Sequence, residues 1–478
     1  MGTASTTQDP PSLARTLEDL HNCIEVIHRT FPGNEELHAV YFSNLVDMER
    51  LHHDLIVPLS QADNAQLAAL LQQGGGLLQN ADDHTKCIDG ILDGQAAVFY
   101  RNQAYLIDLL KTIGRNIEQS GTETVMAGPH DGFVENITEN LSVIRRRIRS
   151  AQLKTISLHV GEITKTQVIV AYIEGIAQDE LIQKLVERIK DIEIDAVFDT
   201  NMLVQMIDDN PNSVFPQFMT TERPDAICSK LTAGRVVCLV DGSPSAFSCP
   251  SSFFEFFTSP DDYYQRWLLG SALRLLRIIG FVVTIVFTAF YVSLTTFHYE
   301  MIPHTMLLNL TQSRSRVPFP PLYEALLMEI TIELLREAGA RLPTKIGQTI
   351  GIVGGIVIGQ AAVQAGFTSN ILIIAVASSA IASFVIPSYI MSASIRLVRF
   401  GLIILAGVLG NFGLAIGICW IVIHLSGITN LGASYLSPVA PLSGKEWLDT
   451  FIRGPFSTLR RRPSLVRSPN PNKNKMRK

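Results

Sequence analysis

Two long stretches without a charged residue constrain this chain more than any other feature. No Asp, Glu, Lys or Arg occurs from Ile346 to Ile395, and none occurs from Phe400 to Gly444. A helix needs about 20 apolar residues to cross the hydrocarbon core of a bilayer, so the first stretch has room for two crossings and the second for one. Charged residues make up only 17% of the 478 residues, and the mean hydropathy is +0.23. The sequence therefore predicts an integral membrane protein.

The region after residue 260 predicts an all-α membrane domain with four to six membrane segments. The clear spans are Ile278–Phe297, Ile346–Ala365, Ile371–Ile390 and Leu402–Leu425. A further apolar segment, Leu322–Leu335, contains three glutamates, and we interpret it as a re-entrant or interfacial helix that protein shields from lipid. Arginines before the first span and the basic C-terminal tail place the N-terminal half and the tail in the cytoplasm by the positive-inside rule.

The charged region before the spans predicts an α/β fold in two soluble subdomains. Residues 88–100, 156–161, 168–173 and 235–240 have the composition of strands, the first of these with an Asp-Gly turn. Residues 17–71 and 179–190 have helical spacing. We expect a disordered N-terminus at 1–16, subdomains at 17–150 and 151–260, the membrane domain at 261–438, and a basic, mostly disordered tail at 439–478.

Several classes of function have no support in the sequence. It contains no Walker A motif, no GxGxxG and no GxSxG, and its six cysteines show no CxxC pair. We therefore expect no enzyme activity, no cofactor and no metal site. A net charge of −5 argues against nucleic acid as a partner. The short basic run Arg145–Arg149 is interpreted as a solvated helix face.

Five strings between residues 221 and 365 are distinctive. They are Thr221–Asp225, Asp262–Tyr264, Val317–Pro320, Arg336–Pro343 and Gly347–Ala365. Together they resemble the GerA family of bacterial spore germination proteins, from about residue 153 to residue 438 and more weakly over 17–150. The chain departs from the family pattern at Arg314-Ser315 and in the loop Asn430–Tyr435.

The resemblance implies the A-type subunit of a nutrient-sensing germinant receptor in the inner membrane of a bacterial spore. Its partners would be a permease-like B subunit that binds the nutrient and a lipoprotein C subunit. The resemblance also implies that A subunits form a homo-oligomer, a ring that acts as a nutrient-gated cation channel and releases ions to trigger germination.

The glycine-rich span offers candidates for a pore or gate. Small residues recur there at intervals of three or four, which places them on one stripe of a helix. The stripe fits a tight helix–helix contact as well as it fits a pore lining, and apolar neighbours could gate by dewetting. The candidates are Gly351, Ile352, Gly355, Ile356, Gly359, Ala362 and Val363.

Glu329, Glu333 and Glu337 lie four residues apart on one helix face and are candidates for a cation pathway, because rings of carboxylates attract cations. The alternative is structural pairing with Arg336, Arg341 or Lys345. We expect Glu222, Arg223 and Asp225, which lie beside Pro224, to have a structural role. Arg336 and Arg341 are expected to be structural as well.

Two other functions stay open from the sequence. One is a membrane-anchored scaffold or signal-transducing subunit without a pore of its own. The other is a nutrient transporter, which the lack of a visible internal repeat disfavours.

Overall fold

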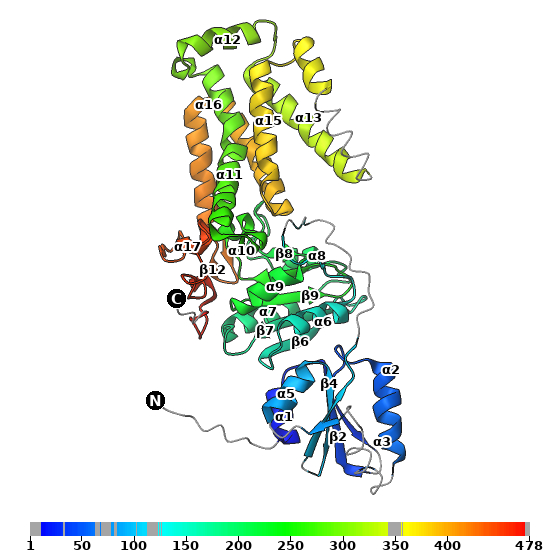
Figure 1. Ribbon diagram of the computed structural model, residues 1–478. Helices are drawn as coiled ribbons and strands as arrows, with labels where there is room; N and C mark the ends of the chain where they lie inside the picture. The colour runs from blue at the N-terminus through cyan, green and yellow to red at the C-terminus, as the bar shows by residue number, and fades with distance from the viewer. Residues whose placement is uncertain are drawn as a thin grey trace. The chain divides into compact units, whose positions relative to one another are not determined.

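The computed structural model describes residues 11–31, 34–62, 67, 78–80, 84–101, 103–111, 123, 125, 127–342, 355 and 357–473. The chain divides into two compact units. The α/β unit contains residues up to 208, residues 218–250 and residues from 460 onward, and the helical unit contains residues 209–217 and 251–459. The predicted α/β fold of the N-terminal region and the predicted helical fold of the C-terminal region are both present (Figure 1).

The first subdomain of the α/β unit is built on an antiparallel sheet with the strand order β1-β2-β4-β5-β3. Neighbouring residues of one strand enter different apolar clusters, as Ala39 and Val40 of β2 do, so both faces of the sheet are buried. The strands are β1 (Val26–Phe31), β2 (Asn34–Phe42), β3 (Leu78–Asn80), β4 (Gln95–Tyr100) and β5 (Gln103–Asp108). The helices are α1 (Leu13–Asp19), α2 (Met48–Arg50), the π-helix η1 (Leu51–Ile56), α3 (Val57–Gln61) and α5 (His84–Leu92).

Two local predictions for this subdomain are wrong. The helical pattern over residues 17–71 fails at 26–42, which form β1 and β2. The strand–turn–strand expected over 88–100 is instead the end of helix α5 followed by strand β4. Residues 39–42 of β2 are buried in succession, which removes the alternation of apolar and polar residues that distinguishes a strand from a helix.

The second subdomain contains another antiparallel sheet, with the order β6-β7-β9-β10-β8. The strands are β6 (Leu153–Val160), β7 (Thr166–Ile173), β8 (Met219–Thr221), β9 (Val236–Val240) and β10 (Ala246–Cys249). The helices are α6 (Ile137–Arg147), α7 (Asp179–Lys190), α8 (Thr200–Ile207) and α9 (Pro224–Thr232). The strands predicted at 156–161, 168–173 and 235–240 and the helix predicted at 179–190 are present as β6, β7, β9 and α7.

Arg145 on α6 links the two subdomains, although the sequence suggested a solvated helix face there. Its side chain is 0% exposed and forms an ion pair of 2.8 Å with Glu25, which precedes β1. The guanidinium also donates to the carbonyl of Leu153 (2.7 Å), and the Thr155 hydroxyl donates to the second oxygen of Glu25 (2.6 Å). Within the basic run, Arg145 is therefore a buried structural residue, while Arg149 stays exposed.

The helical unit is a bundle of long helices with short helical segments at its ends. The long helices are α11 (Trp267–Thr296), α13 (Pro321–Arg341), α15 (Asn370–Phe384) and α16 (Tyr389–Gly427). The shorter segments are η2 (Phe253–Phe257), α10 (Asp261–Tyr264), η3 (Tyr299–Met301), α12 (His304–Arg314), the two-residue strands β11 (Thr429–Asn430) and β12 (Ala433–Ser434), and α17 (Trp447–Thr450). Helix α11 packs against both α15 and α16.

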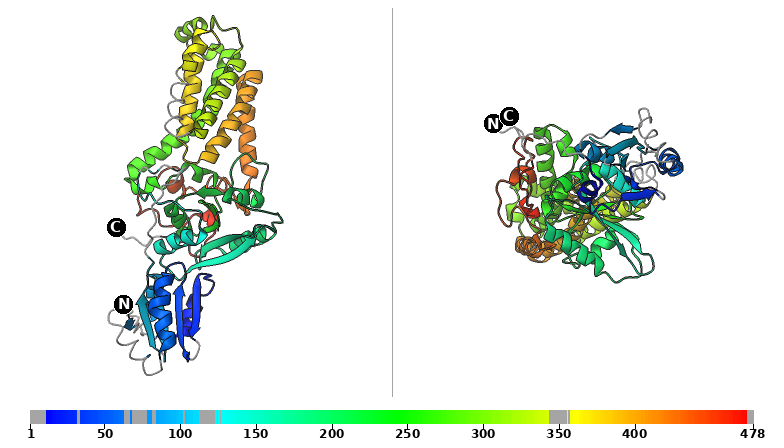
Figure 2. Two further views of the ribbon diagram at one scale, coloured as in Figure 1. Left: turned by 90° about the vertical axis from the view of Figure 1, so that its right-hand side faces the viewer. Right: turned by 90° about the horizontal axis from the view of Figure 1, so that it is seen from below.

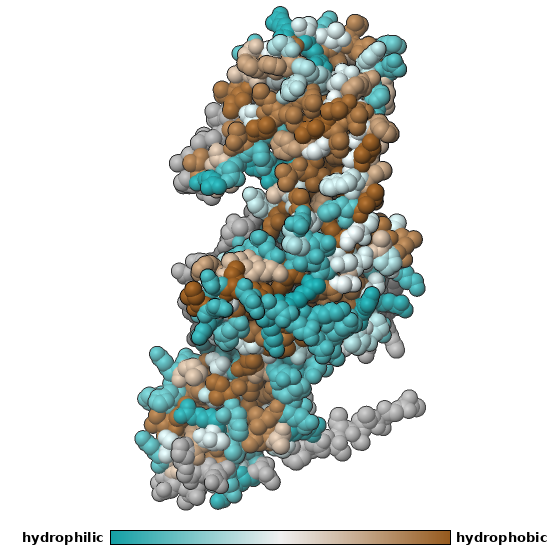
Figure 3. All heavy atoms as spheres, turned by 180° about the vertical axis from the view of Figure 1, so that it is seen from behind, coloured by the Kyte–Doolittle hydropathy of each residue, from teal (hydrophilic) through white to brown (hydrophobic). Residues whose placement is uncertain are grey.

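Within the described residues, α11 and α16 are long and apolar enough to cross a membrane, and α15 is a shorter apolar helix. Large apolar side chains stay exposed along these helices, for example Ile381 at 67% and Phe412 at 70%. The surface of this unit is predominantly brown in the hydropathy view (Figure 3). Exposed apolar side chains in such numbers are expected of helices that face lipid.

Helix α16 turns back on itself at Gly410, where one span was predicted over residues 402–425. Gly410 has φ +66° and ψ −144°, which interrupts the helix. Gly417 then lies against Leu402, and Gly413 lies against the carbonyl of Leu405. In a straight helix, residues 402 and 417 would be about 22 Å apart. Residues 389–409 and 411–427 therefore form two antiparallel helices, which Figure 2 shows side by side.

A short segment between α8 and β8 belongs to the helical unit, although both of its neighbours belong to the α/β unit. Residues 209–217 are bonded to the end of α16 and to the loop after it. His424 of α16 is hydrogen-bonded to Ser213 (2.9 Å), and the Tyr435 hydroxyl donates to the carbonyl of Pro216 (2.5 Å).

The basic tail, expected to be mostly disordered, has defined structure up to Lys473. Residues from 460 onward belong to the α/β unit and include a short 3-10 helix, η4 (Ser464–Val466). Val466 is 1% exposed. It covers Gly234, where a Cβ atom would come within 3.2 Å of the Val466 side chain.

Candidate functional site

The acidic face of α13 is packed inside the helical unit. Glu329 is 0% exposed and forms an ion pair with Arg399 of α16, which is also 0% exposed. Arg399 in turn donates to the hydroxyl of Ser379 on α15 (2.7 Å). This cluster therefore ties α13, α16 and α15 together in the apolar interior of the bundle. Each charge needs its partner there, because an unpaired charge is costly in such surroundings.

Glu333 is the next acidic residue on this face of α13, and it also pairs with α16. Its carboxylate lies 3.0 Å from the guanidinium of Arg396, which is 7% exposed. Arg336 donates to the hydroxyl of Ser383 (3.0 Å) and stacks over the ring of Phe384 (4.4 Å) at the end of α15. Ion pairs of these glutamates were predicted with Arg336, Arg341 or Lys345, whereas the partners of Glu329 and Glu333 are Arg399 and Arg396.

Glu337 has different surroundings. It pairs with Arg341 one turn later on α13 (2.6 Å), and both side chains are more than half exposed. Of the three candidates for a cation pathway, two are thus held in interhelical ion pairs and one is paired on the surface. Among the described residues, each of these carboxylates is thus paired with an arginine.

The pore or gate candidates are only partly covered by the structure. Gly351, Ile352 and Ile356 lie outside the described residues, and so does Lys345. Gly355, Gly359, Ala362 and Val363 are described and helical. A Cβ atom added to Gly355 or Gly359 would meet no described atom within 4 Å. Gly355 and Gly359 therefore have no described neighbour on this side of the helix.

The charged residues at the start of α9, Glu222, Arg223 and Asp225, form local hydrogen bonds and an ion pair. The Arg223 guanidinium donates to both carboxylate oxygens of Asp225 (3.1 and 2.8 Å), and both side chains are buried. The carbonyl of Glu222 accepts the backbone N–H of Phe133 (2.8 Å). Fork-shaped pairs of this kind fix a loop in one geometry. Pro224 is the first residue of the helix, where its missing N–H costs nothing.

Glu123 adds a titratable group to this network. Its carboxylate accepts the Thr221 hydroxyl (2.9 Å). Burial raises the pKa of Glu123 to about 7, although the Thr221 hydrogen bond and the charge of Arg223 act in the opposite direction. Glu123 was not predicted, because nothing in its sequence context distinguishes it from a surface carboxylate.

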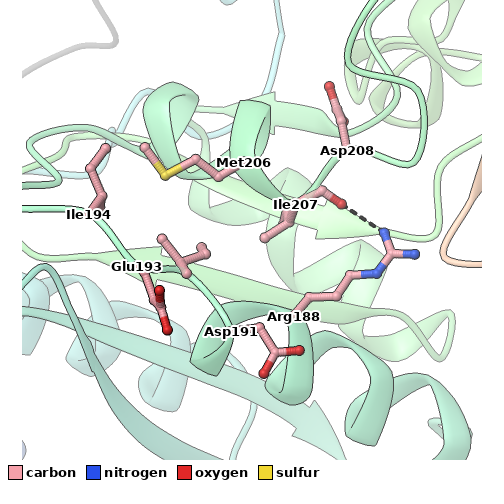
Figure 4. Close-up of a pocket in the computed structure, with 8 residues that line it drawn as sticks. Arg188, Asp191, Glu193, Ile194, Met206, Ile207 and Asp208 are labelled. Carbon is pink, nitrogen blue, oxygen red and sulfur yellow. Dashed lines mark hydrogen bonds between the residues drawn. The ribbon is translucent and has the colours of Figure 1, made fainter.

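A shallow hollow of about 480 Å³ lies in the α/β unit (Figure 4). It lies between the end of α7, the following loop and the end of α8. Arg188 at its side donates to the carbonyl of Ile207 (2.7 Å), so this guanidinium is used within the fold. The other lining residues are Asp191, Ile192, Glu193, Ile194, Met206 and Asp208. The hollow is shallow and open, and its charged lining mixes Arg188 with three carboxylates, so its lining does not indicate one class of ligand.

Comparison with known proteins decides the family. Residues 14–465 match the family described as Bacillus/Clostridium GerA spore germination protein. The chain belongs to the GerA family. This GerA protein is 39% identical to spore germination protein GerQA of Bacillus cereus over 96% of this chain and 94% of that protein.

Two further relatives come from Bacillus subtilis (strain 168). Spore germination protein KA is 36% identical over 95% of the GerA chain and 86% of its own length. Spore germination protein A1 is 38% identical over 90% and 89%, respectively. The crystal structure of the N-terminal domain of the A subunit of the Bacillus megaterium spore germinant receptor GerK3 covers 50% of this chain and 94% of that domain, at 27% identity and a TM-score of 0.39.

Proposed function

We propose that this GerA protein is the A-type subunit of a nutrient-sensing germinant receptor and that copies of it assemble into a cation channel. Family membership over nearly the whole chain supports the receptor role. In this proposal the protein lies in the inner membrane of the spore, with the N-terminal half and the C-terminal tail in the cytoplasm. It acts with a permease-like B subunit and a lipoprotein C subunit, and it catalyses no reaction.

The open glycine stripe is the observation that carries the channel proposal. Gly355 and Gly359 have no described neighbour on the side where a side chain would be. A helix inside a finished bundle would have that side covered, since small residues in membrane helices allow close helix contacts. An uncovered stripe fits a helix that meets its counterpart in another copy or borders a shared passage. Val363, half-buried and one turn beyond Gly359, is then placed to narrow the passage.

Ion flux from vesicles tests this proposal. The full chain is reconstituted with its partner subunits into vesicles loaded with potassium, and potassium release is recorded after nutrients are added. Gly359→Leu should abolish release without unfolding the chain, because the added side chain meets open space in the protomer. Gly401→Leu is the matched control, since Gly401 on α16 also has no described atom within 4 Å of a Cβ position. No release from the assembled wild-type receptor would overturn the channel role.

The buried ion pairs favour a second candidate, a signal-transducing subunit without its own pore. Glu329 and Glu333 are occupied by Arg399 and Arg396 and are not free to attract cations in the single chain. In that case the helical bundle transmits a conformational change, while another subunit conducts the cations. Potassium release that persists in Gly359→Leu and requires only the B subunit would support this alternative.

A further inference from the structure

Two large apolar side chains protrude at one end of the second sheet of the α/β unit. Ile163, in the turn between β6 and β7, is 77% exposed, and Phe198, just before α8, is 69% exposed. Neither belongs to a helix that could face lipid. An isolated exposed apolar side chain is normal in a folded protein. Here, however, the two side chains lie on neighbouring segments that are hydrogen-bonded to each other.

Backbone hydrogen bonds hold the two segments in fixed positions. The N–H of Glu162 donates to the carbonyl of Ile194 and the N–H of Ile163 to that of Asp195, both at 2.9 Å. The Thr166 hydroxyl donates to the carbonyl of Val197 (2.6 Å). The apolar groups are therefore presented by a rigid surface, and docking a partner there would cost little ordering entropy.

Acidic residues surround the two apolar side chains. Glu162, Asp191, Glu193 and Asp195 are all exposed on or beside these segments, against two exposed cations, Lys165 and Lys190. We call Glu162, Ile163, Asp191, Glu193, Asp195 and Phe198 the acidic-apolar surface. An apolar centre with a charged rim is the usual composition of a protein–protein contact, and the negative rim requires a basic partner.

The basic C-terminal tail is attached at the opposite end of the same sheet. Ser468 donates to the carbonyl of Ile176 (2.5 Å), just after β7, and Arg462 donates to the carbonyl of Thr232 (3.1 Å). Strand β7 runs for 8 residues from the acidic-apolar end to the tail end, a distance of roughly 27 Å. One unit therefore cannot bring the two surfaces together, although two copies can.

The charge of the tail complements the acidic-apolar surface. Residues 460–478 contain eight Lys or Arg and no Asp or Glu. Arg460, Arg461, Arg467 and Lys473 are exposed. The side chains of Arg462 and Ser468 and the buried Val466 hold the tail, and a bridge between Arg461 and Asn472 pairs its backbone with itself. The exposed cations therefore stand on a segment of defined structure.

We propose that α/β units of neighbouring copies join head to tail, with the acidic-apolar surface of one copy against the basic tail of the next. Such a contact joins two different surfaces and closes into a ring when the rotation between copies allows it. The inference rests on the proposed assembly of the subunit and adds the surfaces that drive it. The contacts between copies are then made by the α/β unit and are separate from any passage between the membrane helices.

Charge reversal with a compensating swap tests the pairing. Self-association of the full chain in detergent is measured by mass photometry over a range of concentrations. One variant carries Glu193→Lys with Asp195→Lys, a second carries Arg461→Glu with Lys473→Glu, and a third carries all four. Glu49→Lys with Asp89→Lys, exposed positions of the first subdomain, is the matched control for the change in charge. Thermal unfolding of each variant verifies that it folds.

Each reversal alone should raise the dissociation constant about tenfold or more, and the fourfold swap should bring it back to within about threefold of wild type. Ile163→Ser with Phe198→Ser should weaken assembly in the same way. A wild-type chain that stays monomeric, reversals without effect, or a swap that does not restore assembly would overturn the proposal. So would reversals that impair binding of another subunit and leave self-association unchanged. Normal assembly without potassium release would contradict the channel role and leave this inference standing.

Discussion

The carboxylate of Glu329 on α13 and the guanidinium of Arg399 on α16 form an ion pair in which neither side chain is exposed. The two residues are 70 positions apart in the chain, so the pair fixes how two distant helices pack. Ser379 of α15 completes the contact by accepting a hydrogen bond from Arg399 (2.7 Å). Losing one partner would leave the other charge buried without compensation.

Glu329→Gln should therefore destabilise the helical unit, by about 3 kcal/mol, which is typical of breaking a buried ion pair. Glu337→Gln is the control. Glu337 pairs with Arg341 on the surface, and exposed pairs contribute less than about 1 kcal/mol. Thermal unfolding in detergent measures both variants. Equal and small effects would show that the Glu329 pair does not hold α13 to α16.

Neutralising Glu333 tests the cation pathway separately from stability. If the carboxylate serves conduction, Glu333→Gln should reduce potassium release while assembly stays normal. Arg396→Gln removes the other member of the 3.0 Å pair and should lower stability without a comparable loss of release from the chains that do fold. Unchanged release in a normally assembled Glu333→Gln receptor would rule out the pathway role.

Gly410→Ala should disrupt the turn inside α16. The residue has φ +66° and ψ −144°, which only glycine adopts readily, and a Cβ atom there would lie 2.9 Å from Nε2 of His298 and 3.1 Å from Phe297. We expect a loss of about 2 kcal/mol or more. Gly401→Ala, in open space on the same helix, should be neutral or slightly stabilising. A Gly410→Ala protein as stable as wild type would contradict the turn.

Arg145→Met should loosen the link between the two subdomains of the α/β unit. Its partner Glu25 would be left buried with only the Thr155 hydroxyl, and the expected loss is about 3 kcal/mol. Arg149→Met removes the same charge four residues later, from a side chain that is 65% exposed, and should change stability by less than about 0.5 kcal/mol. Denaturant unfolding of the full chain compares the two, and similar midpoints would refute the role of Arg145.

The raised pKa of Glu123 predicts a pH dependence of the α/β unit. A carboxyl group whose pKa is about 7 when folded and 4.5 when unfolded adds stability below pH 4.5 and loses that contribution as the pH rises through 7. Because Glu123 is only partly buried, we expect an effect of about 1 kcal/mol. Glu123→Gln should remove this slope between pH 5 and 8 and be the more stable protein at pH 8. Parallel pH profiles would disprove the assignment.

Strong local signals made part of this fold predictable. The helix α7 has apolar residues at helical spacing, and β7 and β9 are short apolar runs bounded by turn residues, so each was predicted to within two residues of its ends. Two of the three acidic side chains of Leu322–Leu335, Glu324 and Glu329, are shielded by protein as expected, while Glu333 is partly exposed.

Features that depend on residues far apart were missed. Hydropathy could not reveal the turn at Gly410, because glycine is common in membrane helices and the segment is apolar on both sides of it. The partners of Glu329 and Glu333 lie on α16, beyond the reach of a spacing argument made on one helix. Arg145 looked like a member of a surface run because its partner Glu25 is 120 residues away.

The contact between Val466 and Gly234 also has a consequence for biosynthesis. A ribosome makes the chain from its N-terminus, so Val466 can reach Gly234 only after α16 has been translated. A nascent chain that stops earlier keeps Gly234 uncovered, while a chain translated past residue 466 can cover it. The α/β unit can therefore be completed only after every helix of the other unit has been translated.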